Sequence, residues 1–199
     1  MGYGTLLDVL GSIIIGGILL TIVFRLNGAA TEKTYNNSGE LSLQQNLSTI
    51  AQIIEHDFRK IGYCADWNKL PDPTKAILLA DSSAIKYLTD VEPDGNLDSI
   101  YYYLGPTSEL LATENPRDRI LYRVINDEAP VQSNLGVTQF YMVYYDALGD
   151  RINLPISNNG EISSIEINVT VENVAAYDTS YSKAYWRQIR MVSRNLINR

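Results

Sequence analysis

One short stretch of the sequence carries carboxylates at the spacing of a metal-binding loop. Its oxygen donors alternate with other residues and lead to Gly95, which is how the front of a calcium loop is built. However, Tyr101 stands where an EF-hand needs its bidentate glutamate. We therefore expect an acidic, solvated hairpin loop, with bound calcium as the alternative. The candidate ligands for that calcium are Asp90, Glu92, Asp94 and Asp98.

Other residue types that support catalysis are scarce. The one histidine, His56, lies beside Glu55 and Asp57 on the polar side of a predicted helix, where we expect it to be solvated. The one cysteine, Cys64, has no base placed beside it, and we expect a small buried residue rather than a nucleophile. The sequence has no serine in a nucleophile elbow and no Cys/His cluster at metal-ligand spacing. We therefore expect neither an enzyme nor a cofactor.

The first structural element predicted from the sequence is an apolar N-terminal helix. Asp8 is the only charged side chain in residues 1–24, and Arg25 closes the apolar run. About twenty apolar residues, at about 1.5 Å each, can span the roughly 30 Å hydrocarbon core of a bilayer. A secretory signal peptide is the alternative, but such a peptide has a basic segment before its apolar run, and this one has none. We expect residues 1–26 to form a membrane helix.

Asp8 stands out in that helix because an acid inside hydrocarbon costs about 3 kcal/mol on insertion scales. It therefore needs a partner, and the least costly one is a positive N-terminal amine, on the same chain or on the same helix of a neighbouring subunit. The alternative is that Asp8 lies at the membrane interface, where the helix dipole favours an acid in the first turns.

The second element continues the first over residues 27–62. Residues 27–40 are polar and form either a joint or a solvated stretch of helix. From about residue 41, apolar side chains recur every three or four residues, which predicts an amphipathic helix that ends at Gly62. Its apolar stripe consists of Leu43, Leu47, Ile50, Ile54, Phe58 and Ile61.

Residues 63–199 change to a strand-like pattern and form a globular, β-rich domain. Short runs of β-branched and aromatic residues are separated by Gly, Pro, Asn and Asp. The alternation from Ile165 to Glu172 is typical of a half-buried antiparallel strand with one face free to cover the helix stripe. We predict an α+β fold in which a long helix packs on an antiparallel sheet. The predicted strands are 76–80, 84–88, 99–104, 119–125, 137–145, 162–174 and 185–196.

The net charge, the single cysteine and the glycosylation sequons narrow the classes of function that the chain can have. The net charge is −7 and the isoelectric point is about 4.7, which argues against nucleic acid, because its phosphates are bound by cationic residues. A single cysteine cannot form a disulfide within the chain. Of the three Asn-X-Ser/Thr sequons, at Asn36, Asn46 and Asn168, the one at Asn36 is expected to be the most accessible, because it lies in the polar stretch.

Several segments together resemble a protein family. Tyr3, Thr5 and the residues up to Asp8 are similar to the opening motif of type IV pilin-like proteins, although Gly4 is inserted and the acid is Asp rather than Glu. More narrowly, the chain resembles PilW-like minor pilins and J-type minor pseudopilins. The segments that follow the family's order are 47–63 (LSTIAQIIEHDFRKIGY), 121–123, 136–145 and 194–196.

The resemblance implies a structural subunit of an extracellular type IV pilus-like filament. The apolar helix would hold the chain in the membrane until membrane assembly machinery adds it to a helical homopolymer, with other pilin-like subunits as further partners. The alternative is a low-copy subunit at the tip of a pilus or of a type II secretion pseudopilus. The expected assembly residues are Met1, Tyr3, Thr5, Asp8, Gly16 and Gly17.

Gly11, Gly16 and Gly17 lie inside the apolar helix, and each costs about 1 kcal/mol of helix stability relative to alanine. A bilayer enforces an intact helix because it offers backbone groups no other partner. We therefore expect the Gly16-Gly17 region to be helical in the membrane and unwound in a filament. The alternative is that the glycines serve close helix packing.

Overall fold

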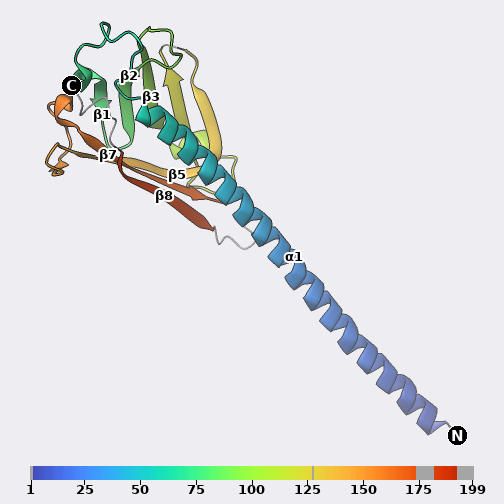
Figure 1. The fold of residues 1–199 in the computed structure, drawn as a ribbon. Coiled ribbons are helices and arrows are strands. Elements are labelled where there is room, and N and C mark those ends of the chain that lie inside the picture. The colour runs from blue at the N-terminus through green and yellow to red at the C-terminus, as the bar shows by residue number, and fades with distance from the viewer. Residues whose placement is uncertain (1, 127, 174–181, 192–199) are drawn as a thin grey trace.

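The computed structural model describes residues 2–126, 128–173 and 182–191. It consists of one long helix and a curved sheet that packs around the C-terminal half of that helix (Figure 1). The helix, α1, runs from Tyr3 to Arg59, and its 57 residues give a length of about 86 Å at about 1.5 Å per residue. It is continuous through residues 27–40, so the polar stretch is a solvated helix and not a joint. The helix ends slightly before the predicted Gly62, which adopts a positive φ of 73° in the turn that follows.

The described strands form an eight-stranded antiparallel sheet in the order β1-β2-β3-β4-β5-β7-β8, with β6 paired to β5. The predicted α+β fold, a long helix on an antiparallel sheet, is confirmed. The strands are β1 (Ile77–Ala80), β2 (Ala84–Thr89), β3 (Asp98–Leu104), β4 (Arg119–Ile125), β5 (Val131–Tyr145), β6 (Arg151–Ile152), β7 (Ser164–Glu172) and β8 (Lys183–Met191).

Two strand predictions need correction. β5 begins at Val131 rather than at residue 137. Its pairing with β4 shifts register between Ser133 and Val137, and Gly136, which lies in that stretch, has a positive φ of 74°. β6 was not predicted, since two residues are too short to show a period. Residue 174 and residues 192–196 of the predicted last two strands, with the family-like segment 194–196, lie outside the described residues.

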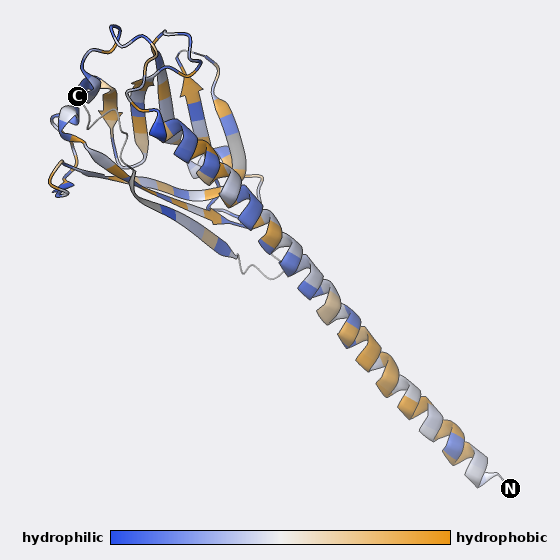
Figure 2. Ribbon diagram, viewed as in Figure 1, coloured by the Kyte–Doolittle hydropathy of each residue, from blue (hydrophilic) through white to orange (hydrophobic). Residues whose placement is uncertain are grey.

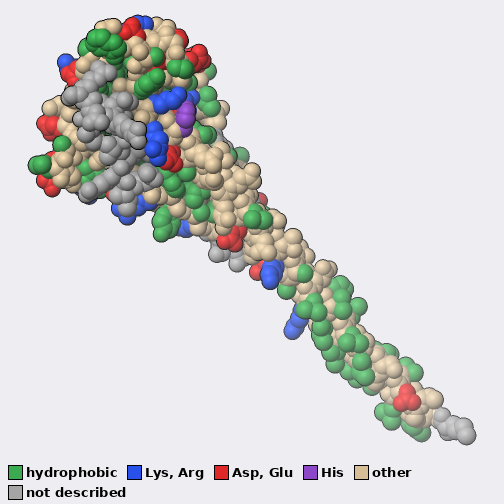
Figure 3. Space-filling model, viewed as in Figure 1, with side chains coloured by type: hydrophobic (Ala, Val, Ile, Leu, Met, Phe, Trp, Pro, Cys, Tyr) green, Lys and Arg blue, Asp and Glu red, His purple; other side chains and the backbone are tan. Residues whose placement is uncertain are grey.

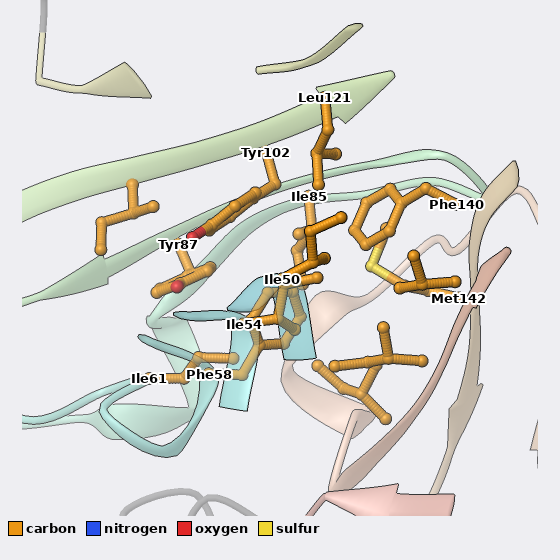
Figure 4. Close-up of a cluster of buried hydrophobic side chains, with 14 of the residues drawn as sticks. Ile50, Ile54, Phe58, Ile61, Ile85, Tyr87, Tyr102, Leu121, Phe140 and Met142 are labelled. Carbon is orange, nitrogen blue, oxygen red and sulfur yellow. The ribbon is translucent and has the colours of Figure 1, made fainter. Parts of the chain in front are cut away.

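The core lies between the helix stripe and the inner face of the sheet. Five of the six stripe residues are buried, and Leu47 is partly buried against them. Phe58 is central: its ring lies 5.6 Å from the ring of Tyr87 on β2 and 5.6 Å from that of Tyr102 on β3 (Figure 4). Such aromatic contacts add about 1 kcal/mol each to the burial of apolar area. The stripe therefore fixes which side of α1 faces the sheet.

The outer face of β7 differs from the prediction. The alternation predicted a solvated polar face, but Glu166 and Asn168 are both buried. Glu166 Oε1 accepts hydrogen bonds from Arg187 Nη2 (2.6 Å) and Asn168 Nδ2 (3.1 Å), and Oε2 accepts one from the Tyr145 hydroxyl (2.9 Å). β7 lies between β5 and β8, so the long side chains of its neighbours cover its polar face and supply the hydrogen bonds that burial requires.

Candidate functional site: the exposed apolar helix

The N-terminal half of α1 is apolar on every side and has no cover. Its large apolar side chains between residues 6 and 26 are between 46% (Ile22) and 71% (Leu7) exposed. Figure 2 shows this half of the helix as predominantly hydrophobic, and Figure 3 shows the same side chains on its surface, beyond the globular part. The helix is long and apolar enough to cross a membrane, and none of its most apolar window is buried. A surface of this kind requires lipid or protein around it.

The hydroxyl groups of this half bond to carbonyls of their own helix. Ser12 Oγ donates to the Asp8 carbonyl (2.7 Å), and Thr21 Oγ1 donates to the Gly17 carbonyl (2.8 Å). Each hydroxyl is thereby satisfied without water or a neighbouring chain. Because backbone and hydroxyl groups are paired internally, the segment can enter an apolar environment at low cost.

Five of the six predicted assembly residues, Tyr3, Thr5, Asp8, Gly16 and Gly17, lie on this uncovered half of α1. Tyr3 is 88% exposed, and Thr5 Oγ1 donates to the Gly2 carbonyl (3.1 Å). The carboxylate of Asp8 is exposed and has no ion pair or hydrogen bond within the described part of the chain. Met1, a further predicted assembly residue, lies outside the described residues. The pairing of Asp8 therefore stays a prediction.

Gly16 and Gly17 are helical, and the space where a Cβ would stand is open at both positions. Within the described part of the chain, no contact requires a glycine at either place. Their role therefore lies either in contacts between chains or in the conformational freedom of the backbone.

The C-terminal half of α1 is held to the sheet by a buried ion pair between Asp57 and Arg123, which was not predicted from the sequence. Asp57 Oδ2 accepts hydrogen bonds from Arg123 Nε on β4 (2.5 Å) and from the Tyr102 hydroxyl on β3 (2.6 Å). Burial alone raises the pKa of Asp57, but the hydrogen bonds from Arg123 and Tyr102 hold it below its ordinary value. Burial also raises the pKa of Tyr102 well above its ordinary value, so Tyr102 stays protonated and donates. The signal in the sequence is that Asp57 occupies a stripe position, three residues after Ile54.

In the acidic loop, Asp90 is a structural residue. Its side chain is buried, and Oδ2 accepts hydrogen bonds from the backbone amides of Ala65 (3.0 Å) and Gly95 (2.9 Å). Those two bonds join the segment after α1 to the turn before β3. Gly95 itself has a φ of 80°, as the tight turn requires.

The other three candidate calcium ligands do not converge on Asp90. Asp94 Oδ1 accepts from the Asn96 amide (2.7 Å), Asp98 Oδ2 accepts from the Val91 amide (3.1 Å), and Glu92 is exposed. Among the described residues, no three acidic, His or Cys side chains are placed to hold one metal ion. The carboxylates instead cap the loop's own backbone.

The remaining sequence candidates are placed as follows. His56 is solvated, with 65% of its side chain exposed, and its Nδ1 lies 3.2 Å from Asp57 Oδ1. Cys64 is half-buried against the core rather than fully buried. Asn36 is exposed on the helix, whereas Asn168 is buried and donates to Glu166. The sequon predicted to be most accessible is therefore exposed in the structure.

Comparison of the chain with protein-family models, with curated proteins and with solved structures found no match.

Proposed function

We propose that this chain is a structural subunit of an extracellular type IV pilus-like filament, held in a membrane by its N-terminal helix before it polymerises. The observation that carries the proposal is the division of one continuous helix into two halves. The first half exposes apolar side chains all round, and the second buries one stripe in a sheet. This is the long apolar helix on an antiparallel sheet that the resemblance to type IV pilin-like proteins implied.

The physical argument starts from the uncovered half. Apolar helices leave a bilayer only when another apolar surface replaces the lipid, and identical helices from neighbouring chains are such a surface. When two copies of a chain meet through different surfaces and the rotation between them does not close a ring, the contact repeats into a helical filament. The globular part, with its net negative charge and hydrogen-bonded loops, would then form the outer surface in water.

The experiment is to express the full chain in its own cells, or with a pilus assembly system, and to separate membrane, soluble and sheared surface fractions. We expect the chain in the membrane and in filaments seen by electron microscopy, where mass spectrometry would find it as the main band. A chain present only in trace amounts in such filaments would instead be a low-copy tip subunit. A full-length chain that stays monomeric in plain buffer would contradict both forms of the proposal.

A further inference from the structure

Part of the segment between β3 and β4 is hydrogen-bonded to the C-terminal end of β7. Residues 111–118, called here the 111–118 loop, lead directly into β4. Asn115 Nδ2 donates to Glu172 Oε2 (3.2 Å) and to the carbonyl of Asn173 (3.2 Å), and Arg117 Nε donates to Glu172 Oε2 (2.8 Å). The loop is therefore fastened to the last residues of β7.

The same end of β7 touches the helix where the helix leaves the globular part. At Gly39 of α1 a Cβ would lie only 2.2 Å from Asn173 Nδ2, so this helix position approaches Asn173 closely. The first buried residue of the helix stripe, Leu43, follows one turn later. Contacts thus run from the 111–118 loop through Asn173 to the exit point of α1.

Asp118 lies at the base of this loop in an unusual state. Its side chain is 1% exposed, and neither carboxylate oxygen has a hydrogen-bond partner among the residues that the structure describes. The hydroxyl of Thr113 lies nearby, but its one proton is shared with the backbone carbonyls of Leu110 (2.9 Å) and Asn115 (3.1 Å). A buried charge without a partner is costly, whereas a protonated carboxyl is tolerated.

Among the described charged groups around Asp118, only Arg117 relieves part of this cost. Arg117, from the same loop, has its guanidinium 2.6 Å from Glu172 on β7, and Lys183 on β8 lies 3.1 Å from the same carboxylate. Both cations therefore already neutralise Glu172, and the negative charge of Glu172 faces Asp118 as well. Among the described residues, the carboxylate of Glu172 therefore has two cationic partners and that of Asp118 has none.

We propose that Asp118 is a proton-sensitive latch. When Asp118 is protonated, the 111–118 loop packs on the end of β7 and, through Asn173, supports α1 where it leaves the sheet near Gly39, a contact called here the brace. When Asp118 is ionised, the loop and the brace both loosen. Burial raises the pKa of Asp118 from its ordinary value of 3.8 to about 6, against an opposing effect of the Thr113 hydroxyl; the charge of Glu172 raises the pKa further and that of Arg117 lowers it. The brace is therefore complete below pH 4 and is lost as the pH rises through about 6. The latch requires no filament, so it stands or falls apart from the proposed function.

The test is amide hydrogen exchange of the full-length chain in detergent at pH 5 and pH 7.5, corrected for the intrinsic rate at each pH. We expect exchange in the 111–118 loop and in helix residues 36–44 to be slower at pH 5. The slowing should be about tenfold for each unit by which opening of the loop lowers the pKa of Asp118. Asp118→Asn mimics the protonated acid, and both segments should then exchange slowly at both pH values. Asp150→Asn, at an exposed acid in the β5–β6 turn, is the matched control and should keep the wild-type pH dependence.

The wild-type measurement alone can overturn the proposal, whether or not a variant folds. Equal corrected protection of the loop at both pH values would show that Asp118 is not a latch. If exchange depended on pH in the 111–118 loop but not in helix residues 36–44, the loop would not support the helix and the brace would be refuted. A pH dependence that persists in Asp118→Asn would assign the titration to another group.

Discussion

Asp57 of α1 and Arg123 of β4 are 66 positions apart in the chain and form a hydrogen-bonded ion pair of 2.5 Å between helix and sheet. The carboxylate is buried, and the guanidinium is mostly buried beside Tyr102. Removal of one member of such a pair leaves the other charge unpaired in the interior, which costs more than the pair itself contributes. The contact therefore fixes the rotation of α1 against the sheet.

We expect Asp57→Ala to destabilise the protein by about 3 kcal/mol, because Arg123 is left buried and unpaired. Urea unfolding of the full chain in detergent measures this loss. The matched control is Glu55→Gln, which removes an exposed ion pair with Arg59 on the same helix and should change stability by less than about 0.5 kcal/mol. Equal effects of the two variants would show that burial of the Asp57 pair does not matter.

Stability should be greatest at mildly acidic pH. The pKa of Asp57 and that of Glu172 are raised by burial but lowered overall by their hydrogen-bond donors, so their contributions are present above about pH 4 and lost as the pH falls. The pKa of Asp118 is raised to about 6, so its contribution is lost as the pH rises through that value. Unfolding midpoints between pH 3 and pH 8 should therefore peak between about pH 4 and 6. In Asp118→Asn the decline above the peak should disappear; a decline that remains would contradict the assignment.

The sequence predicted what depends on periodicity. The helix stripe repeats every three or four residues from Leu43 to Ile61, and the structure buries that stripe because only one side of α1 faces the sheet. The predicted strands are present because β-branched and aromatic runs fit a pleated surface. Their order also followed the chain, as in most antiparallel sheets.

Contacts between distant side chains could not be predicted in this way. Asp57 read as part of a polar triplet with Glu55 and His56, since nothing local indicates that Arg123 will lie above it. The polar face of β7 read as solvated because the alternation does not show that Arg187 and Tyr145 will cover it. Both errors concern buried charge, whose partners are set by the fold.

Gly136→Ala should destabilise the protein by at least about 2 kcal/mol. The position has a φ of 74°, and an added Cβ would lie 2.3 Å from the Glu172 carbonyl oxygen, so both strain and a backbone clash result. Gly28→Ala is the control: it is an exposed helix position with open space around it and should stabilise the helix by about 1 kcal/mol. Thermal unfolding of the two variants side by side gives the comparison, and a harmless Gly136→Ala would mean that β5 can shift its register there.

Asp8→Ala should leave the protein folded and inserted in the membrane but reduce filament yield. Insertion becomes easier because an acid is removed from hydrocarbon, by about 3 kcal/mol on insertion scales. Assembly suffers because the predicted pairing with an N-terminal amine is lost. Membrane fractionation and counts of sheared filaments separate the two effects. Filaments at the wild-type level would favour the alternative, in which Asp8 lies at the membrane interface.

The glycine pair supplies the last prediction. In the isolated chain α1 is helical through Gly16 and Gly17, and among the described residues nothing lies within 4 Å of the places where their Cβ atoms would be. The variant Gly16→Ala with Gly17→Ala therefore fits the monomer and should stabilise its helix by about 1 kcal/mol for each residue. If a filament requires this region to unwind, the variant should insert in the membrane normally and polymerise poorly. Close packing through glycine would lower the yield too, so a side-chain-resolved map of the wild-type filament decides between them: unbroken helical hydrogen bonds from Leu10 to Phe24 would refute the unwinding.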